Sequence, residues 1–151
     1  MKTLLIVFHT GGVKTAQMAE AVARGAQGEA GVNVVVRRCA EAGPEDVLAA
    51  DGLILGTPEN FGYMSGMMKD FLERVFYPCE GKVNGRPWAL FVGAGQDGHG
   101  AVTSVERIVT GLRLNKVHDP VIGLKELTPD VIAKCEELGA AFAAGLAMGV
   151  F

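Results

Sequence analysis

The sequence predicts an α/β protein with a five-stranded parallel sheet in the doubly wound order 2-1-3-4-5 and helices on both faces. Short apolar runs rich in valine, leucine and isoleucine alternate along the chain with segments of helical periodicity, and glycine- or proline-containing turns separate them. Parallel neighbours need crossover connections, which cover both faces of a sheet. With the first strand flanked on both sides, the common five-strand order is 2-1-3-4-5, and a ligand is expected where strands 1 and 3 end.

The first half of the chain contains a β-α-β unit, a further helix and a further strand. Lys2 to Phe8 is a continuous apolar run and Val32 to Arg38 is rich in valine, so both are predicted to be strands. Apolar residues recur with helical spacing over about 14–27, where two glycines then end the helix. A short helix is expected at Pro44 to Ala50, with proline in its first position, and a buried strand at Gly52 to Leu55.

The second half repeats the alternation. A strongly patterned helix is expected directly after Tyr63, followed by a strand at Trp88 to Val92 and a helix at Ala101 to Leu114. A weaker fifth strand is expected at Val117 to Ile122. Thr128 is a good N-cap with proline after it, so it opens the last helix.

Length and composition limit the function classes. A chain of 151 residues suits one domain, 1–151, with a substantial core. The net charge of −3 disfavours nucleic-acid binding, which needs a basic surface. Three cysteines without CxxC spacing favour reduced thiols and a cytoplasmic protein. The apolar C-terminal segment is too short to span a bilayer, and the three histidines lack metal-ligand spacing.

The first of three loops expected at one sheet edge is His9 to Thr15, between the first strand and the first helix. Free amides and the helix dipole favour an anion there, so a phosphate fits. Glycines let the backbone approach a ligand, and Thr10, Lys14 and Thr15 could add donors or charge. The alternative is a tight turn with an ordinary capping threonine. The P-loop spacing is absent.

The second loop is Gly56 to Tyr63. Phe61 and Tyr63 would be exposed unless they cover something flat, so a planar ring is the predicted ligand, and Asn60 could bond its polar edge. The alternative is that one aromatic side chain only packs at the entry to the helix. The three methionines that follow are more typical of a core or an interface.

The third loop is Gly93 to Gly100, which contains GxGxxG with Asp119 about twenty residues later. The dinucleotide fingerprint belongs to a first β-α turn, whereas this loop comes late, so its glycines more simply allow close approach to a ring. Asp97 and His99 are expected to be a solvated pair, and the alternative is that they contact the ligand or the electron donor. A triad of Ser104 with these two side chains lacks a nucleophile elbow, so no catalytic side chain is predicted.

The segment GTPENFGYMSGMMKDFLERV resembles GTP-x-x-F/Y-G-x-M-x-x-x-x-K-x-F-x-[DE]-R of flavodoxin-like NAD(P)H:quinone oxidoreductases of the tryptophan-repressor-binding-protein type and related NADPH-dependent FMN reductases. The resemblance extends over essentially the whole chain. It implies a flavodoxin-like domain that binds the FMN phosphate in the first loop and the isoalloxazine in the other two. The residues expected to bind the cofactor are Thr10, Gly11, Gly12, Val13, Lys14, Thr15, Pro58, Glu59, Asn60, Phe61, Gly62, Tyr63, Gly93, Ala94, Gly95, Gln96, Asp97 and Gly98.

The resemblance implies an FMN oxidoreductase that passes electrons from NAD(P)H to a quinone or similar acceptor, with the chemistry at the flavin N5. One alternative is a flavodoxin-type carrier that exchanges single electrons with protein partners. Another is a domain that has lost FMN, because Val13 stands where the family's phosphate loop usually has glycine. The sequence contains no identifiable basic cluster that would distinguish NADPH from NADH. The methionine-rich helix and apolar C-terminus would suit a homodimer.

Overall fold

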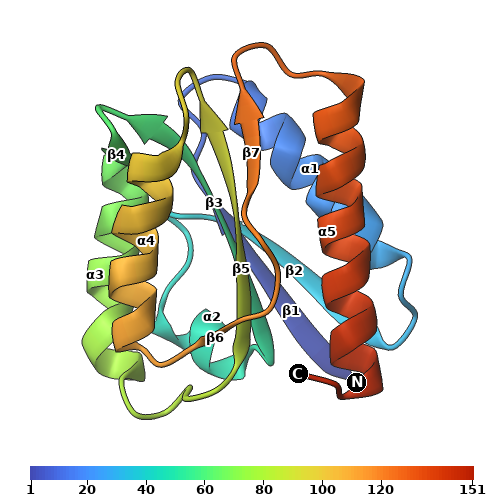
Figure 1. Ribbon diagram of the computed structural model, residues 1–151. Helices are drawn as coiled ribbons and strands as arrows, with labels where there is room; N and C mark the ends of the chain where they lie inside the picture. Colours follow the sequence, from blue (N-terminus) through green and yellow to red (C-terminus); the bar gives the residue numbers. More distant parts are fainter.

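The protein is described by a computed structural model of residues 1–151 (Figure 1). It consists of a twisted sheet between two layers of helices. In chain order, the elements are β1 (Lys2–Phe8), α1 (Lys14–Gln27), β2 (Val32–Arg38), α2 (Pro44–Ala49), β3 (Gly52–Asn60), β4 (Tyr63–Met64), α3 (Gly66–Cys79), β5 (Pro87–Ala94), α4 (His99–Gly111), β6 (Asn115–Lys116), β7 (Val121–Leu124) and α5 (Pro129–Met148).

The strand order confirms the predicted fold class. The sheet runs β2-β1-β3-β5-β6, and β7 also pairs with β5, so β6 and β7 are two pieces of one edge strand. All of these pairings are parallel, which gives the order 2-1-3-4-5. In Figure 1, α1 and α5 cover one face and α3 and α4 cover the other.

The core has two halves because successive strand residues point to opposite faces of the sheet. In β1, Leu5 and Val7 pack on the side of α3 and α4, whereas Leu4 and Ile6 pack on the side of α1 and α5. The central strands are buried on both faces, which is why they appear as continuous apolar runs. Close packing of α5 on α1 depends on Gly139, where a Cβ would collide with the backbone carbonyl of Val22.

The helices follow their predicted boundaries to within a few residues. Thr128 caps α5 as expected, because its hydroxyl accepts a hydrogen bond of 3.3 Å from the amide of Val131. Crossing a bilayer requires a helix of greater length and apolarity than any in this structure.

Two predicted details are wrong. The segment after Leu55 is not a loop: β3 continues to Asn60 and pairs with β4 in an antiparallel hairpin, so α3 begins only at Gly66. The predicted strand at 117–122 is interrupted over 117–120 and resumes as β7. Pro120 lacks an amide donor, which suits a break in an edge strand.

Candidate functional site

The three predicted loops meet at the carboxyl edge of the sheet, at the top of Figure 1. The Lys14 ammonium of the first loop donates a 2.9 Å hydrogen bond to the carbonyl of Ala94, at the start of the third. The Glu59 carboxylate of the second loop accepts bonds from the amides of Gly98 and Ala101, at 3.2 and 3.1 Å. The fold therefore joins segments that are far apart in the sequence into one surface.

The N-terminus of α1 offers hydrogen-bond donors that no side chain occupies. The helix begins after Val13 without a side-chain hydrogen bond to its first-turn amides. Each of the other helices has a side-chain acceptor near its start: Asp46 for α2, Ser65 for α3, Glu59 for α4 and Thr128 for α5. Free amides at the positive end of a helix dipole favour an anion.

The side chains of the first loop are mostly engaged within the protein. The Thr10 hydroxyl donates to the carbonyl of Gly12 at 2.8 Å, and Thr15 is buried against β5. Lys14 spans to the third loop, and burial lowers the pKa of its ammonium. Gly11 and Gly12 face open space, since a Cβ at either would meet nothing within 4 Å. The loop therefore presents mainly backbone to a ligand.

The first residue of the first loop is His9, whose surroundings disfavour a positive charge on its side chain. Burial lowers the pKa of its imidazole, and the nearby Arg38 guanidinium lowers that pKa further. The anion site at α1 consequently relies on amides and the helix dipole.

The second loop is the tip of the β3–β4 hairpin. Phe61 and Gly62 occupy its two turn positions with φ of 55° and 66°, the left-handed pair of a type I′ turn. The Phe61 side chain is fully exposed, and Tyr63 is 43% exposed. Pro58 and Asn60 lie on the strand side of the turn, where Pro58 pairs with Gly93 of β5.

Hydrogen bonds to two hydroxyl side chains stabilise the base of the hairpin, and neither residue was among the predicted site residues. The Thr57 hydroxyl accepts a 3.0 Å bond from the amide of Ser65, and the Ser104 hydroxyl accepts one of 3.0 Å from the amide of Met64. Ser104 also donates to the carbonyl of Ala101, so it is a support for the hairpin. The only sequence signal for these two hydroxyls is that they lie on buried faces. Sequence periodicity does not indicate which backbone amides they contact.

The third loop is shorter than predicted, because β5 includes Gly93 and Ala94. Gly95 and Gln96 are exposed, and a Cβ at Gly95 would meet nothing within 4 Å. The Asp97 carboxylate accepts a 2.9 Å bond from the amide of His99, and its second oxygen lies 3.8 Å from the His99 ring. Both side chains are exposed, in agreement with the expected solvated pair.

A basic cavity beside the hairpin was also missed by sequence reasoning. It brings together Lys69 of α3 with His99 and Arg107 of α4. The four-residue spacing of His99, Thr103 and Arg107 was the available signal, but the approach of Lys69 depends on how the two helices face each other.

Comparison with known proteins supports the same family as the sequence motif. Residues 40–126 match the NADPH-dependent FMN reductase family. A flavodoxin of Aquifex aeolicus (strain VF5) is 37% identical over 112 residues, which cover 74% of this chain and 60% of that protein. An NAD(P)H dehydrogenase (quinone) of Acidithiobacillus ferrooxidans is 33% identical over 133 residues, covering 74% of this chain and 66% of that protein. The chain thus spans roughly two thirds or less of the length of these relatives.

Solved structures share the fold over nearly the whole chain. A WrbA-like flavodoxin from Agrobacterium tumefaciens superimposes with a TM-score of 0.80 at 19% identity, covering 99% of both chains. A flavodoxin from the domain Archaea gives a TM-score of 0.83 at 20% identity, covering 95% of this chain and 98% of the other. With the family match over more than half of the sequence, these findings confirm the resemblance. The chain belongs to the flavodoxin-like family of NADPH-dependent FMN reductases.

Proposed function

We propose that this protein binds FMN at the carboxyl edge of its sheet and passes electrons from NAD(P)H to a quinone or a similar acceptor. The observation that carries the proposal is the conformation of Phe61. A bulky side chain in the left-handed region costs roughly 1–2 kcal/mol, and this one is also fully exposed. Arg113 and Lys125 are also exposed with positive φ, but of these three residues only Phe61 presents an aromatic ring, and it does so where the three loops meet. A flat ring is the ligand that an exposed aromatic side chain would cover.

The residues present fit both ends of FMN. The uncapped first turn of α1 supplies amide donors for a phosphate, and Gly11 and Gly12 leave room for it. At the other end, Gly95 leaves the third loop open, and the Asn60 and Gln96 side chains offer hydrogen bonds to the polar edge of a ring. The predicted set Thr10 to Thr15, Pro58 to Tyr63 and Gly93 to Gly98 is proposed as the binding surface.

In this proposal the residues of the chain bind FMN and hold it in a fixed orientation. FMN, when bound, supplies hydride acceptance and electron transfer. Glu59 fixes the hairpin against the start of α4, and Lys14 fixes the first loop against the third, so both ends of the site are held in one geometry. No side-chain acid or base is required.

The quinone acceptor is supported by the relatives named NAD(P)H dehydrogenase (quinone), including that of Acidithiobacillus ferrooxidans. The three cysteines are free and buried, which supports a reducing compartment such as the cytoplasm. Met64 and Met68 are buried in the core, so the proposed homodimer is supported only by the exposed apolar side chains at the C-terminus, Met148, Val150 and Phe151.

The test is reconstitution with excess FMN followed by gel filtration. We expect the protein fraction to retain the visible absorption of flavin, to gain thermal stability, and then to oxidise NAD(P)H steadily when a quinone is added. A colourless protein without a thermal shift would end the proposal, and would favour a domain that has lost FMN.

A charge placed at the α1 N-terminus sharpens this test. Val13 is largely exposed, so Val13→Asp has room and puts a carboxylate beside the expected phosphate. Two negative charges at about 4 Å repel by roughly 1–4 kcal/mol, so FMN affinity should fall about tenfold or more. Val13→Asn isolates the charge, because it has the same shape as Val13→Asp, and Val13→Ala, which adds no acceptor for the first-turn amides, should retain FMN.

A second candidate function is a single-electron carrier, favoured by the similarity to the Aquifex aeolicus flavodoxin. The net charge of −3 is mild for docking to protein partners, which favours the enzyme. FMN-loaded protein that exchanges electrons with a redox protein but does not consume NAD(P)H with a quinone would establish the carrier.

A further inference from the structure

A cavity of about 590 Å³ lies beside the hairpin, between α3 and α4. Its lining includes Gly62 and Tyr63, two residues of the proposed FMN site, together with residues of α3 and α4. Its remaining lining residues are Lys69, His99, Gly100, Thr103, Ser104, Arg107 and Ile108. The cavity is therefore continuous with the place where the ring is proposed to bind.

The lining is basic in an acidic protein. The cavity contains the side chains of Lys69, His99 and Arg107 and no carboxylate, although the chain has 17 acidic and 14 basic residues. Arg107 is exposed and takes part in none of the ion pairs of the structure. Lys69 has only a 3.7 Å pairing with Glu73, whose side chain is 67% exposed. Such an exposed pair contributes little, so Lys69 can turn to another anion.

The arrangement of the donors suits a phosphate. His99, Thr103 and Arg107 are four residues apart and form a row of roughly 12 Å along one face of α4. Lys69 reaches the same cavity from α3. Arginine binds phosphate with a planar, two-pronged fork, and lysine adds a point charge.

We propose that this cavity binds a phosphate group of the nicotinamide dinucleotide donor, with Arg107 and Lys69 as the principal ligands. The inference rests on the proposed function, since it adds a subsite for the donor next to the FMN site. The phosphate has two possible sources: the 2′-phosphate that only NADPH carries, and the pyrophosphate that NADPH and NADH share.

The first experiment measures binding of phosphate probes by calorimetry to the full-length protein supplied with FMN. Adenosine 2′,5′-bisphosphate represents the 2′-phosphate, and ADP represents the pyrophosphate. Losing one charge-assisted contact should weaken a probe about tenfold or more in Arg107→Gln and in Lys69→Gln. Lys134→Gln is the matched control, because Lys134 is an exposed residue of α5 with a surface partner in Asp130.

The two sources predict different patterns. If the cavity takes the 2′-phosphate, Arg107→Gln weakens adenosine 2′,5′-bisphosphate and raises the KM for NADPH, while ADP binding and the KM for NADH stay unchanged. If it takes the pyrophosphate, both probes weaken and both KM values rise. Either pattern supports the subsite, and unchanged binding of both probes in both variants overturns it.

Failure of this inference differs from failure of the proposed function. If the protein binds FMN and oxidises NADPH, but Arg107→Gln and Lys69→Gln leave its kinetics unchanged, the proposed function stands and the proposed subsite is wrong. Protein that rejects FMN, yet binds a phosphate probe in a way that depends on Arg107, loses the proposed function and keeps a phosphate site.

Discussion

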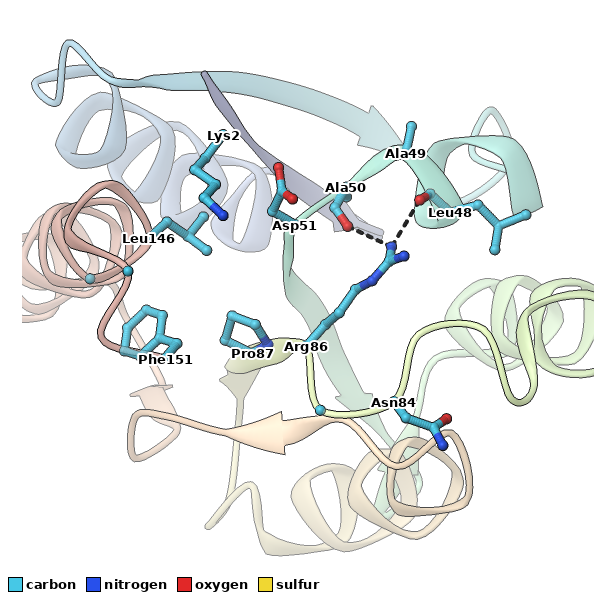
Figure 2. Close-up of a pocket in the computed structure, with 13 residues that line it drawn as sticks. Lys2, Leu48, Ala49, Ala50, Asp51, Asn84, Arg86, Pro87, Leu146 and Phe151 are labelled. Carbon is cyan, nitrogen blue, oxygen red and sulfur yellow. Dashed lines mark hydrogen bonds between the residues drawn. The ribbon is translucent and has the colours of Figure 1, made fainter.

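The amino and carboxyl edges of the sheet differ in how completely their polar groups are hydrogen-bonded within the protein. At the amino edge, a cavity of about 340 Å³ is lined by residues that include Asp51 and Arg86 (Figure 2). The Asp51 carboxylate accepts a 2.8 Å bond from the amide of Thr3, and Arg86 is surrounded by carbonyl acceptors. At the carboxyl edge, the first-turn amides of α1 lack side-chain partners and Phe61 is strained and exposed.

Arg86 explains why the amino-edge cavity is structural. Its guanidinium donates to the carbonyls of Leu48 and Ala50 at 2.8 Å each, and more weakly to those of Val47 and Lys82 at 3.3 Å. The two shorter bonds satisfy the carbonyls of Leu48 and Ala50 at the end of the short helix α2, where the last carbonyls have no partner within the helix. The presence of a cavity therefore does not by itself identify the ligand site of this protein. The first-turn amides of α1 without side-chain partners and the exposed ring of Phe61 are the better guide.

Removing the guanidinium should produce the largest effect on stability. Arg86→Met keeps an unbranched apolar stem but leaves the carbonyls of Leu48 and Ala50 without a partner, so we expect the free energy of unfolding to fall by about 2–4 kcal/mol. Urea denaturation measures this change. The Kd for FMN should stay at its wild-type value in the folded protein.

The control for that variant is Lys82→Met, an exposed residue of the same segment, which should change stability by no more than about 0.5 kcal/mol. A folded Arg86→Met protein with weakened FMN binding would mean that the two edges are coupled, and the contrast between them would be wrong.

A smaller effect is expected where the hairpin rests on α4. A Cβ at Gly100 would collide with the carbonyl of Gly62, so Gly100→Ala must displace the hairpin tip. Overpacking of this kind costs about 1–3 kcal/mol, and here FMN affinity should fall with stability. Gly66→Ala is the matched control, because its Cβ would meet nothing within 4 Å. Equal FMN affinity in both variants would show that the position of the hairpin does not matter for binding.

The sequence predicted the strands and helices because strands buried on both faces leave continuous apolar runs, as in β1, and because glycines and capping residues such as Thr128 mark the helix ends. The strand order was predicted because 2-1-3-4-5 is a common arrangement of five parallel strands. It missed the hairpin because type I′ turns favour Asn-Gly or Asp-Gly, and Phe61-Gly62 carries no such signal. It missed the cavity of Lys69 and Arg107 because periodicity fixes which face of a helix is buried, and does not fix what two neighbouring helices present to each other.

The smallest predicted change in stability has the opposite sign and most directly tests the contrast between the edges. Asparagine tolerates the left-handed conformation far better than phenylalanine, so Phe61→Asn should raise the free energy of unfolding by about 1 kcal/mol. The same change removes the aromatic surface, so FMN affinity should fall by about 2- to 13-fold, the equivalent of 0.5–1.5 kcal/mol of ring contact. Phe61→Ala separates the two effects, because it removes the ring without providing a residue that favours the turn. If Phe61→Asn gained stability and kept its FMN affinity, the strain at the hairpin tip would have no connection with the cofactor. A loss of affinity together with a gain of stability would mean that the hairpin tip is held in a less stable conformation in order to present an aromatic ring to the cofactor.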